Sequence, residues 1–446
     1  MGKTIRIRKG LNINIKGQAK EDIVETSLPT KFAIKPEDFP GLIPKLVAKE
    51  GELVKVGSVL FYDKGREEIK FTSPVSGKVS AIVRGAKRKI LAIELESDGA
   101  FTPVSFDTNK DIKELLLSSG MWTFIKQRPL DKIANPAVAP KAIFVTGFNS
   151  APLAPNYEFL LKGKEKEIQK GIEALKTLTK GKVHVTVEHA NGSAGVFSKV
   201  SGIELHKIAG KHPKGNVGTQ IHHIDPVNKG ETVYTLNALD VARIGDFILT
   251  GQTNFDRVLP VTGSEVSAPQ YVKTKVGAQM SSIISGNVSS NHVRIISGNV
   301  LTGKTSSEDD YLGYYSDQVT VIPEGDKHKF FITEGWLAPG FNKLSANPVF
   351  PSALFKNKKF DVDTNTNGEE RAFVMSGHYE KVFPFDIYPV QLLKAIITND
   401  IDGMENLGIY EVAPEDFALC EFVCVSKINS QQIVREGLAV VEKECM

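Results

Sequence analysis

Two cysteines four residues apart, Cys420 and Cys424, have a spacing that suggests metal or redox chemistry. On a helix they share one face. A zinc site needs four nitrogen or sulfur ligands, and an iron–sulfur cluster needs four thiolates. The third cysteine, Cys445, is far off in the sequence, and three thiols cannot complete either site. We therefore predict buried structural thiols in an apolar seam, surrounded by Phe417, Leu419, Phe422 and Val423.

Histidines also cluster, since four of the nine lie close together: His206, His212, His222 and His223. The stretch TQIHHID is predicted to be a strand. Neighbouring side chains on a strand point to opposite faces, so the adjacent pair cannot easily bind one ion. No carboxylate or cysteine completes a ligand spacing typical of metal sites. We predict hydrogen-bonded or surface histidines here.

A nucleotide-binding pattern occurs once, in GNVLTGKT at residues 298–305. A phosphate-binding loop needs a strand before it and a helix after it. The following SSEDDYLGYYSDQ has no helical apolar stripe and puts three acids next to the supposed phosphate site. We predict a glycine-rich hairpin turn instead. No dinucleotide fingerprint follows the predicted strand KAIFVTGF at 141–148.

Composition limits the class of protein. The chain has 446 residues, a net charge of +3 and three cysteines. The charge is too small for a nucleic-acid binder, and the cysteine content fits a reducing compartment. The sequence shows no signal peptide and no apolar run of about 20 residues that a membrane span needs. A role at a membrane is therefore expected through partner subunits or surface contact.

The elements that must position these residues fall into several segments. The N-terminal 1–35 reads as a strand segment, and 36–103 alternates with period two, as an all-β domain does. The latter resembles lipoyl or biotinyl carriers, although Lys64 and Lys70 lie outside the carrier motif. A carrier protein modified on either lysine is one alternative function.

After residue 103 the spacing of apolar residues changes. Residues 104–253 read as a parallel α/β domain, with one helix over 156–181 capped at Gly181. Residues 254–335 read as a small mixed or antiparallel β domain that includes KFFITEG. Residues 336–370 read as a linker, and 371–446 as helices, with Asn429 and Gln432 as a capping box.

With these residues laid out, the chain resembles the A subunit family of Na+-translocating NADH:quinone oxidoreductases over essentially its whole length. The most specific stretches are KGLNINIKG, FTSPVSGKVSAIVRGAKRKIL, HPKGNVGTQIHHIDPVNKGETVYTLN, RVLPVTGSEV and ALCEFVCVSKI. More distant relatives are the C subunit of Rnf complexes and the NADH-binding flavoprotein of complex I. The resemblance implies a barrel-sandwich, a Rossmann-like domain, a β-grasp domain of the soluble-ligand-binding type (SLBB) and a degenerate ferredoxin-like helical domain.

The same relatives imply an origin for the cysteine pair. The Rnf subunit has two runs of Cys-x2-Cys-x2-Cys-x3-Cys-Pro. Aligned with the second run, this chain keeps Cys420 and Cys424 as non-ligand remnants, and Pro414, Phe417 and Val425 replace the rest. Aligned with the first run, only Pro384 agrees. The ligand positions of that run hold Phe373, Ser376, Tyr379 and Phe383.

The glycine-rich flavin and NADH loop of the relatives corresponds to residues 118–130. Here that stretch has one glycine, with Trp122 and Arg128 in it. Close approach of the backbone to a phosphate is expected to be blocked. The resemblance thus implies an architecture for NADH, flavin and clusters that has lost the residues holding them.

The resemblance implies a peripheral subunit on the cytoplasmic side of the bacterial inner membrane. It would support quinone reduction coupled to Na+ export without being catalytic alone. Its partners would be the other five subunits, which would hold NADH, flavins and iron centres, and this chain would hold no tight cofactor, although a quinone is possible. The alternative is an independent NADH-oxidising flavoprotein like the Rnf subunit.

The basic run Arg84, Lys87, Arg88 and Lys89 would meet anionic lipid or an acidic partner, or is simply a solvated turn.

Overall fold

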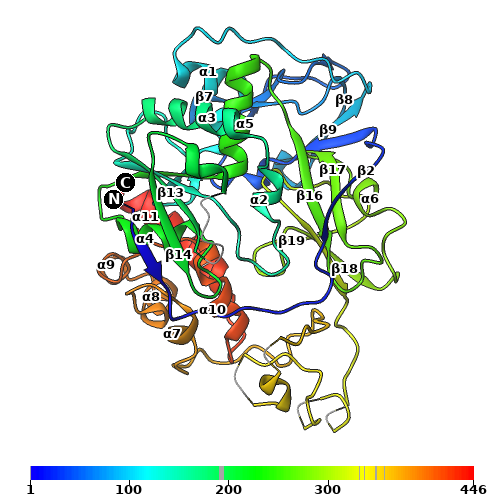
Figure 1. Ribbon diagram of the computed structural model, residues 1–446, viewed down its shortest axis with the longest axis vertical. Coiled ribbons are helices and arrows are strands. Elements are labelled where there is room, and N and C mark those ends of the chain that lie inside the picture. The colour runs from blue at the N-terminus through cyan, green and yellow to red at the C-terminus, as the bar shows by residue number, and fades with distance from the viewer. Residues whose placement is uncertain (1, 190–194, 331, 336, 347–348, 356) are drawn as a thin grey trace.

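A computed structural model describes residues 2–189, 195–330, 332–335, 337–346, 349–355 and 357–446. The described part of the chain contains four β-sheets and a group of C-terminal helices (Figure 1). None of its helices combines the length and apolarity required to cross a bilayer.

Residues 31–97 form two small antiparallel sheets, which confirms the all-β prediction for 36–103. One sheet has the order β3-β9-β8-β5, with bounds Lys31–Ile34, Ile90–Ser97, Gly77–Arg84 and Leu53–Val54. The other has the order β4-β6-β7, with bounds Pro44–Leu46, Val59–Asp63 and Arg66–Thr72. Two single 3-10 turns, η1 at Pro36–Asp38 and η2 at Ala86–Arg88, interrupt the strands.

The α/β region contains a seven-stranded sheet of order β1-β14-β13-β12-β15-β10-β11. Its strands are Thr4–Arg6, Glu204–Ala209, Lys182–Glu188, Ala142–Thr146, Val233–Asn237, Lys126–Arg128 and Lys132–Ile133. Strands β12 and β13 are parallel, as the predicted β-α-β succession requires. The helices and turns of this region are α1 Ile112–Ser119, η3 Met121–Phe124, α2 Tyr157–Leu160, α3 Glu165–Thr177, η4 Gly195–Lys199, α4 Val217–Ile224 and α5 Ala238–Thr250.

Two local predictions for this region were wrong. The single helix expected over 156–181 is split into α2 and α3, because Gly163 adopts a left-handed φ of 81° between them. Helix α3 ends at Thr177, with Leu178 and not Gly181 as its C-cap. The stretch TQIHHID belongs to helix α4, where Val217, Ile221 and Ile224 repeat at helical spacing toward the core.

The third region is a mixed six-stranded sheet of order β19-β18-β20-β16-β17-β2, with helix α6 Met280–Ile284 beside it. Its strands are Lys304–Ser306, Val293–Ser297, Val319–Pro323, Asp256–Thr262, Gln270–Lys275 and Lys20–Glu25. The predicted strand KFFITEG is wrong, since its described residues form turns and no neighbouring strand pairs with them.

The predicted helical C-terminal region is confirmed, with bounds α7 Tyr379–Val382, α8 Pro389–Ile397, α9 Ile401–Asn406, η6 Pro414–Phe417, α10 Ala418–Val423 and α11 Ser430–Cys445. The Asn429 side chain caps α11 by accepting from the Gln432 amide at 3.2 Å. Before this region, the linker has only the short turn η5 Pro351–Leu354 in its described residues.

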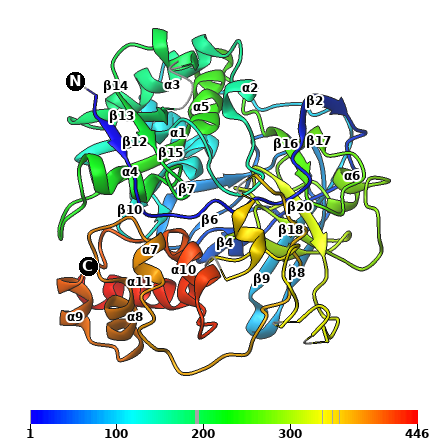
Figure 2. The ribbon, with the colours of Figure 1, turned by 60° about the horizontal axis from the view of Figure 1, so that its bottom comes forward.

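The N-terminal segment joins all four regions. Strand β1 pairs with β14, β2 pairs with β17, and β3 pairs with β9. Between β1 and β2, Ile13 and Ile15 lie in the core of the C-terminal helices. Figure 2 shows this dark blue segment running from the α/β sheet past the helices to β2. The N-terminal segment therefore connects regions that are distant in sequence.

Candidate functional site

A cavity of about 560 Å³ lies where the four regions meet. Thr146 and Asn237, at the carboxyl ends of β12 and β15, line it, as do residues of the mixed sheet and Glu415 and Arg435 of the C-terminal helices. In open α/β sheets, ligands bind outside the carboxyl ends of the strands. The sequence analysis did not identify this cavity, although the polar residues ending both buried strands were a usable signal.

One buried carboxylate organises the polar part of the cavity. Asp317 accepts hydrogen bonds from the Asn149 amide and the Tyr157 hydroxyl, both at 3.1 Å. Burial raises the pKa of Asp317, and burial beside that carboxyl raises the pKa of Tyr157 well above its usual value. The Tyr157 hydroxyl therefore stays protonated and donates to the Asp317 carboxyl oxygen.

Aromatic rings and charges line the rest of the cavity. Tyr315 donates to the Thr123 carbonyl at 2.6 Å, and the Lys126 ammonium lies 4.3 Å from the centre of the Tyr315 ring. Among the lining side chains, four are lysine or arginine and seven are carboxylates: Glu37, Asp38, Asp131, Asp240, Asp310, Asp317 and Glu415. This excess of negative charge disfavours phosphate groups.

A buried arginine contacts Glu415, which lines the cavity on the side of the C-terminal helices. The Arg128 guanidinium, only 1% exposed, contacts Glu415 Oε1 and Asp416 Oδ2, each at 2.8 Å. The carboxylates raise the pKa of Arg128 against the effect of burial. A Cβ on Gly218, in the first turn of α4, would collide with the Asp416 carboxylate. An internal acid thus lies against a helix start, where a phosphate would otherwise bind.

The stretch 118–130 is filled by its own side chains. Trp122 is buried, and its indole N–H donates to the Ala134 carbonyl at 2.8 Å. Its ring also packs edge-on against Tyr234. A buried indole and an ion-paired arginine therefore occupy this stretch.

The cysteine pair lies in the apolar core of the C-terminal helices, as predicted. Cys420 is in α10, while Cys424 follows the helix with extended backbone, and both are buried. Burial raises the pKa of the Cys420 thiol well above its usual value. The Cys424 sulfur accepts from the Ile428 amide at 3.4 Å, and Cys445 is only partly buried.

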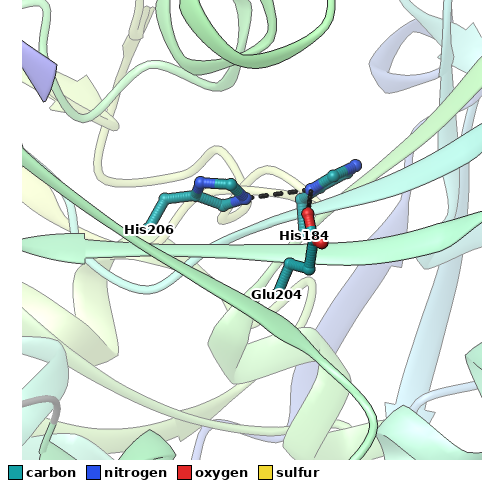
Figure 3. Close-up of side chains that lie close together, drawn as sticks. All are labelled: His184, Glu204 and His206. Carbon is teal, nitrogen blue, oxygen red and sulfur yellow. Dashed lines mark hydrogen bonds and ion pairs between the residues drawn. The ribbon is translucent and has the colours of Figure 1, made fainter. Parts of the chain in front are cut away.

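A group of three side chains with metal-binding chemistry was missed by the sequence analysis (Figure 3): His184, Glu204 and His206. They converge because β13 and β14 are parallel, with His184 opposite Glu204. His206 Nε2 lies 2.9 Å from His184 Nδ1, which is 3.5 Å from Glu204 Oε2. The alternation of side chains on two adjacent strands was the available signal.

The hydrogen bonds of this group fit neutral histidines better than a metal site. The Lys3 amide donates to His206 Nδ1 at 2.9 Å, so the proton of a neutral His206 ring is on Nε2. That N–H then donates to His184 Nδ1, and a metal at Nε2 would require its removal. Burial lowers the pKa of His206 to about 4. These hydrogen bonds run from Lys3 through His206 to His184 and help to attach β1 to the sheet.

The other clustered histidines are hydrogen-bonded, as predicted. His212 Nδ1 lies 3.0 Å from Ser150 Oγ, and burial lowers its pKa to about 4. His222 accepts from the Asp386 amide on Nε2 and contacts Glu411 through Nδ1 at 2.7 Å. His223 bonds the Thr219 carbonyl. His222 therefore links α4 to the C-terminal helices.

The nucleotide-binding pattern is a hairpin turn, as predicted. Residues 298–303 connect β18 to β19, which pair antiparallel, and the described residues after them include no helix before α7 other than the short turn η5. Gly298 has a φ of 112° and packs against Gly303. The two glycines make the turn tight, which explains the pattern without a phosphate.

The basic run lies at the tip of the hairpin formed by β8 and β9. Arg84, Lys87, Arg88 and Lys89 are all exposed. Lys87 and Arg88 have positive φ angles of 53° and 60°, and Arg84 donates to the Arg88 carbonyl at 3.3 Å. On a separate hairpin, Lys64 is exposed at the turn, while the Lys70 ammonium lies 4.6 Å from the centre of the Tyr62 ring.

Comparison with known proteins decides the family. Family models match three parts of the chain: the NqrA N-terminal barrel-sandwich hybrid domain at 5–98, the NqrA second alpha/beta domain at 107–253 and the NQRA C-terminal domain at 258–308. The A subunit of the Na(+)-translocating NADH-quinone reductase from Saccharophagus degradans is 38% identical over 99% of this chain and 100% of its own. This chain belongs to the A subunits of the Na+-translocating NADH-quinone reductases.

Other relatives agree with this family. The protein of the same name from Neisseria meningitidis serogroup A is 38% identical over 99% of this chain and 100% of its own. An NAD+-reducing NiFe hydrogenase in its H2-reduced state covers 70% of this chain and 55% of its own, at 9% identity and a TM-score of 0.35. That likeness is too loose to support an argument. By its family, the chain is one component of a sodium-translocating oxidoreductase complex.

Proposed function

We propose that this member of the family is a peripheral component on the cytoplasmic side of the bacterial inner membrane. It holds no NADH, flavin or iron–sulfur cluster of its own, and it is not catalytic in isolation. The other five subunits provide those redox groups, and the membrane is reached through them. The finer fold assignments, Rossmann-like for the α/β region, β-grasp for the mixed sheet and ferredoxin-like for the C-terminal helices, belong to the same proposal.

The packing of the vestigial cluster positions is the observation that carries the proposal. In two-cluster ferredoxins, the fourth cysteine of each run ligates the cluster of the other run. The corresponding positions pair in the same crossed way here. The Phe383 ring lies 4.8 Å from the Phe417 ring, and burial together with the neighbouring Cys424 side chain raises the pKa of Tyr379. This supports a ferredoxin-like origin of the region.

Aromatic side chains now occupy those positions. Phe373 and Tyr379 have ring centres 5.9 Å apart, and Phe383 stacks on Phe385 at 4.7 Å. Tyr379, Phe383 and Phe417 are buried. Rings of this size fill the volume of a cluster, and two thiols are too few to ligate one.

The test is anaerobic purification of the full chain followed by analysis of iron, sulfide and flavin. We expect each to be absent at stoichiometric level and the protein to show no visible absorbance. Attempted reconstitution with iron and sulfide should leave the protein colourless. Stoichiometric iron, sulfide or flavin would overturn the proposal and favour the rival Rnf-like flavoprotein. Intact mass tests the carrier alternative, since a lipoyl or biotinyl group on Lys64 or Lys70 adds a fixed increment.

The central cavity supports the proposal that this chain holds no NADH. Its lining carries more carboxylates than cations, and Trp122 and Arg128 fill the stretch where glycines would cradle a phosphate. We expect no saturable quenching of NADH fluorescence by the purified chain. A quinone headgroup is neutral, and the aromatic walls of the cavity suit one better. Titration with a short-chain quinone analogue tests this, and absence of saturation would count against it.

The basic hairpin tip is proposed as a contact for an acidic surface of another subunit. Arginine guanidinium groups match carboxylates with two parallel hydrogen bonds, and Arg84 and Arg88 are held close by their mutual contact. Reversing Arg84, Lys87, Arg88 and Lys89 to glutamate should abolish co-purification with the other subunits. Reversing four exposed lysines around α3 is the matched control: Lys162, Lys164, Lys166 and Lys180. Equal recovery of the complex with both variants would show that the tip is a solvated turn.

A further inference from the structure

Residues 327–360, called here the apolar segment, expose an unusual amount of apolar surface. They hold seven of the 21 exposed large hydrophobic side chains in the described chain: Phe330, Ile332, Leu337, Phe341, Val349, Leu354 and Phe355. That is a third of the total in less than a tenth of the length. Leu354 is 82% exposed and Val349 73%. Apolar surface concentrated in this way marks an interaction site.

The segment is attached to the rest of the molecule at both ends. It follows β20, and at its far end Phe360 exchanges backbone hydrogen bonds with Asn14 and Lys16 at 2.9 and 3.0 Å. Lys329 forms an ion pair with Asp363. Figure 1 shows the segment in yellow as the lowest part of the molecule. The apolar side chains are therefore presented by a loop whose base is fixed.

Its charges distinguish a lipid surface from a protein surface. Residues 327–360 contain six lysines, one glutamate and no arginine. The acids that follow are turned toward the body, since Asp361 pairs with Lys16 and Asp363 with Lys329. Protein–protein interfaces are enriched in arginine and depleted in lysine. Lysines beside exposed phenylalanines suit a bilayer, where the stems lie along apolar surface and the ammonium groups reach anionic headgroups.

Lysine contacts inside the segment fit this arrangement. The Lys343 ammonium lies 5.4 Å from the centre of the Phe350 ring, and Lys358 donates to the Phe341 carbonyl at 2.8 Å. These bonds hold the loop while Phe341, Leu354 and Phe355 remain exposed. We propose that the apolar segment inserts these side chains into the interfacial layer of a bilayer containing anionic lipid. The subunit would then touch the membrane directly as well as through its partners, which goes beyond the proposed function.

The test uses the full chain and extruded vesicles of two compositions, phosphatidylcholine alone and equal parts phosphatidylcholine and phosphatidylglycerol. We expect co-sedimentation with the anionic vesicles that weakens as salt is raised. The variant Phe341→Ser, Leu354→Ser, Phe355→Ser should weaken it at least about tenfold, because each ring or leucine loses its apolar burial in the bilayer. The double variant Lys327→Glu, Lys359→Glu should weaken binding to the anionic vesicles and should not change binding to vesicles of phosphatidylcholine alone.

Two controls separate insertion from general stickiness. Leu53→Ser and Leu249→Ser remove exposed leucines elsewhere and should leave binding unchanged. Circular dichroism should show every variant folded, since all the altered residues are exposed. No binding of the parent chain to either vesicle would overturn the proposal. Vesicle binding by the triple variant equal to that of the parent chain would also overturn it. If the triple variant fails to co-purify with the other subunits and the parent chain binds no vesicles, the segment contacts a partner protein instead. None of these outcomes depends on the cofactor content that tests the proposed function.

Discussion

At the scale of single residues, burial decides what each chemically capable group does. Cys420 and Cys424 are enclosed by the core of the C-terminal helices, whereas Cys445 is partly exposed. A thiol reacts as the thiolate, and burial raises the pKa of Cys420 so that it stays protonated. The same reasoning applies to Arg128, whose charge is tolerated only because two carboxylates contact it.

The thiols give a direct prediction. Brief treatment of the native protein with a maleimide should add one equivalent, on Cys445. In denaturant all three cysteines should react, as counted by intact mass. Cys445→Ser should leave a native protein that takes up no reagent over the same interval. Rapid modification of Cys420 or Cys424 in the native state would contradict their burial.

The arginine gives a second prediction at this scale. Arg128→Met should lower the free energy of unfolding by about 3–5 kcal/mol, because it leaves Asp416 buried without its partner. Adding Asp416→Asn to that variant should recover part of the loss. Arg435→Met, which breaks the less buried contact to Asp131, is the control and should cost less. Urea unfolding monitored by fluorescence measures all of them.

At the scale of elements, α4 connects the α/β region to the C-terminal helices. His222 on its half-buried side contacts Glu411, and Gly218 in its first turn lies against Asp416. Helix α4 also starts close to the cavity, because Gly215, Asn216 and Val217 line it. Its position thus depends on residues about 200 positions later in the chain.

The glycine in this helix tests that connection. Gly218→Ala improves helix propensity, yet the added methyl collides with the Asp416 carboxylate. We expect a loss of about 1–3 kcal/mol, measured by thermal unfolding, because the packing is too tight to yield. Gly65→Ala, whose new methyl would meet only ordinary contacts, is the control and should be nearly neutral. A stabilised Gly218→Ala protein would contradict the close packing.

At the scale of the whole molecule, buried neutral histidines tie stability to pH. Burial lowers the pKa of His212 to about 4, against about 6.5 in the unfolded chain. Between these values the unfolded state binds the proton and the folded state does not, so stability falls as pH falls through that window. From this histidine we expect a loss of about 2 kcal/mol between pH 7 and pH 5. His212→Gln should remove that part of the slope in urea titrations at both pH values, and an unchanged slope would contradict it.

The sequence alone determined the class of each region. Period-two alternation identified the β region at 36–103, an apolar strand and a predicted helix identified the parallel α/β region, and Asn429 marked a helix start. These signals are local, because they arise from hydrogen bonding and side-chain direction within a few residues. Where local signals conflicted, as in TQIHHID, the alternation of polar residues was misleading and the helical apolar spacing prevailed.

Only the tertiary structure decided which distant residues meet. The N-terminal strands join three different sheets, Arg128 reaches Glu415 and Asp416, and the cavity draws its lining from all four regions. His184, Glu204 and His206 converge because two strands pair in one register. Such contacts depend on sheet order and on packing between regions, and neither leaves a periodic trace in the sequence. The cysteine pair and the phenylalanines beside it in the sequence could be predicted, but the contact between the Phe383 and Phe417 rings could not.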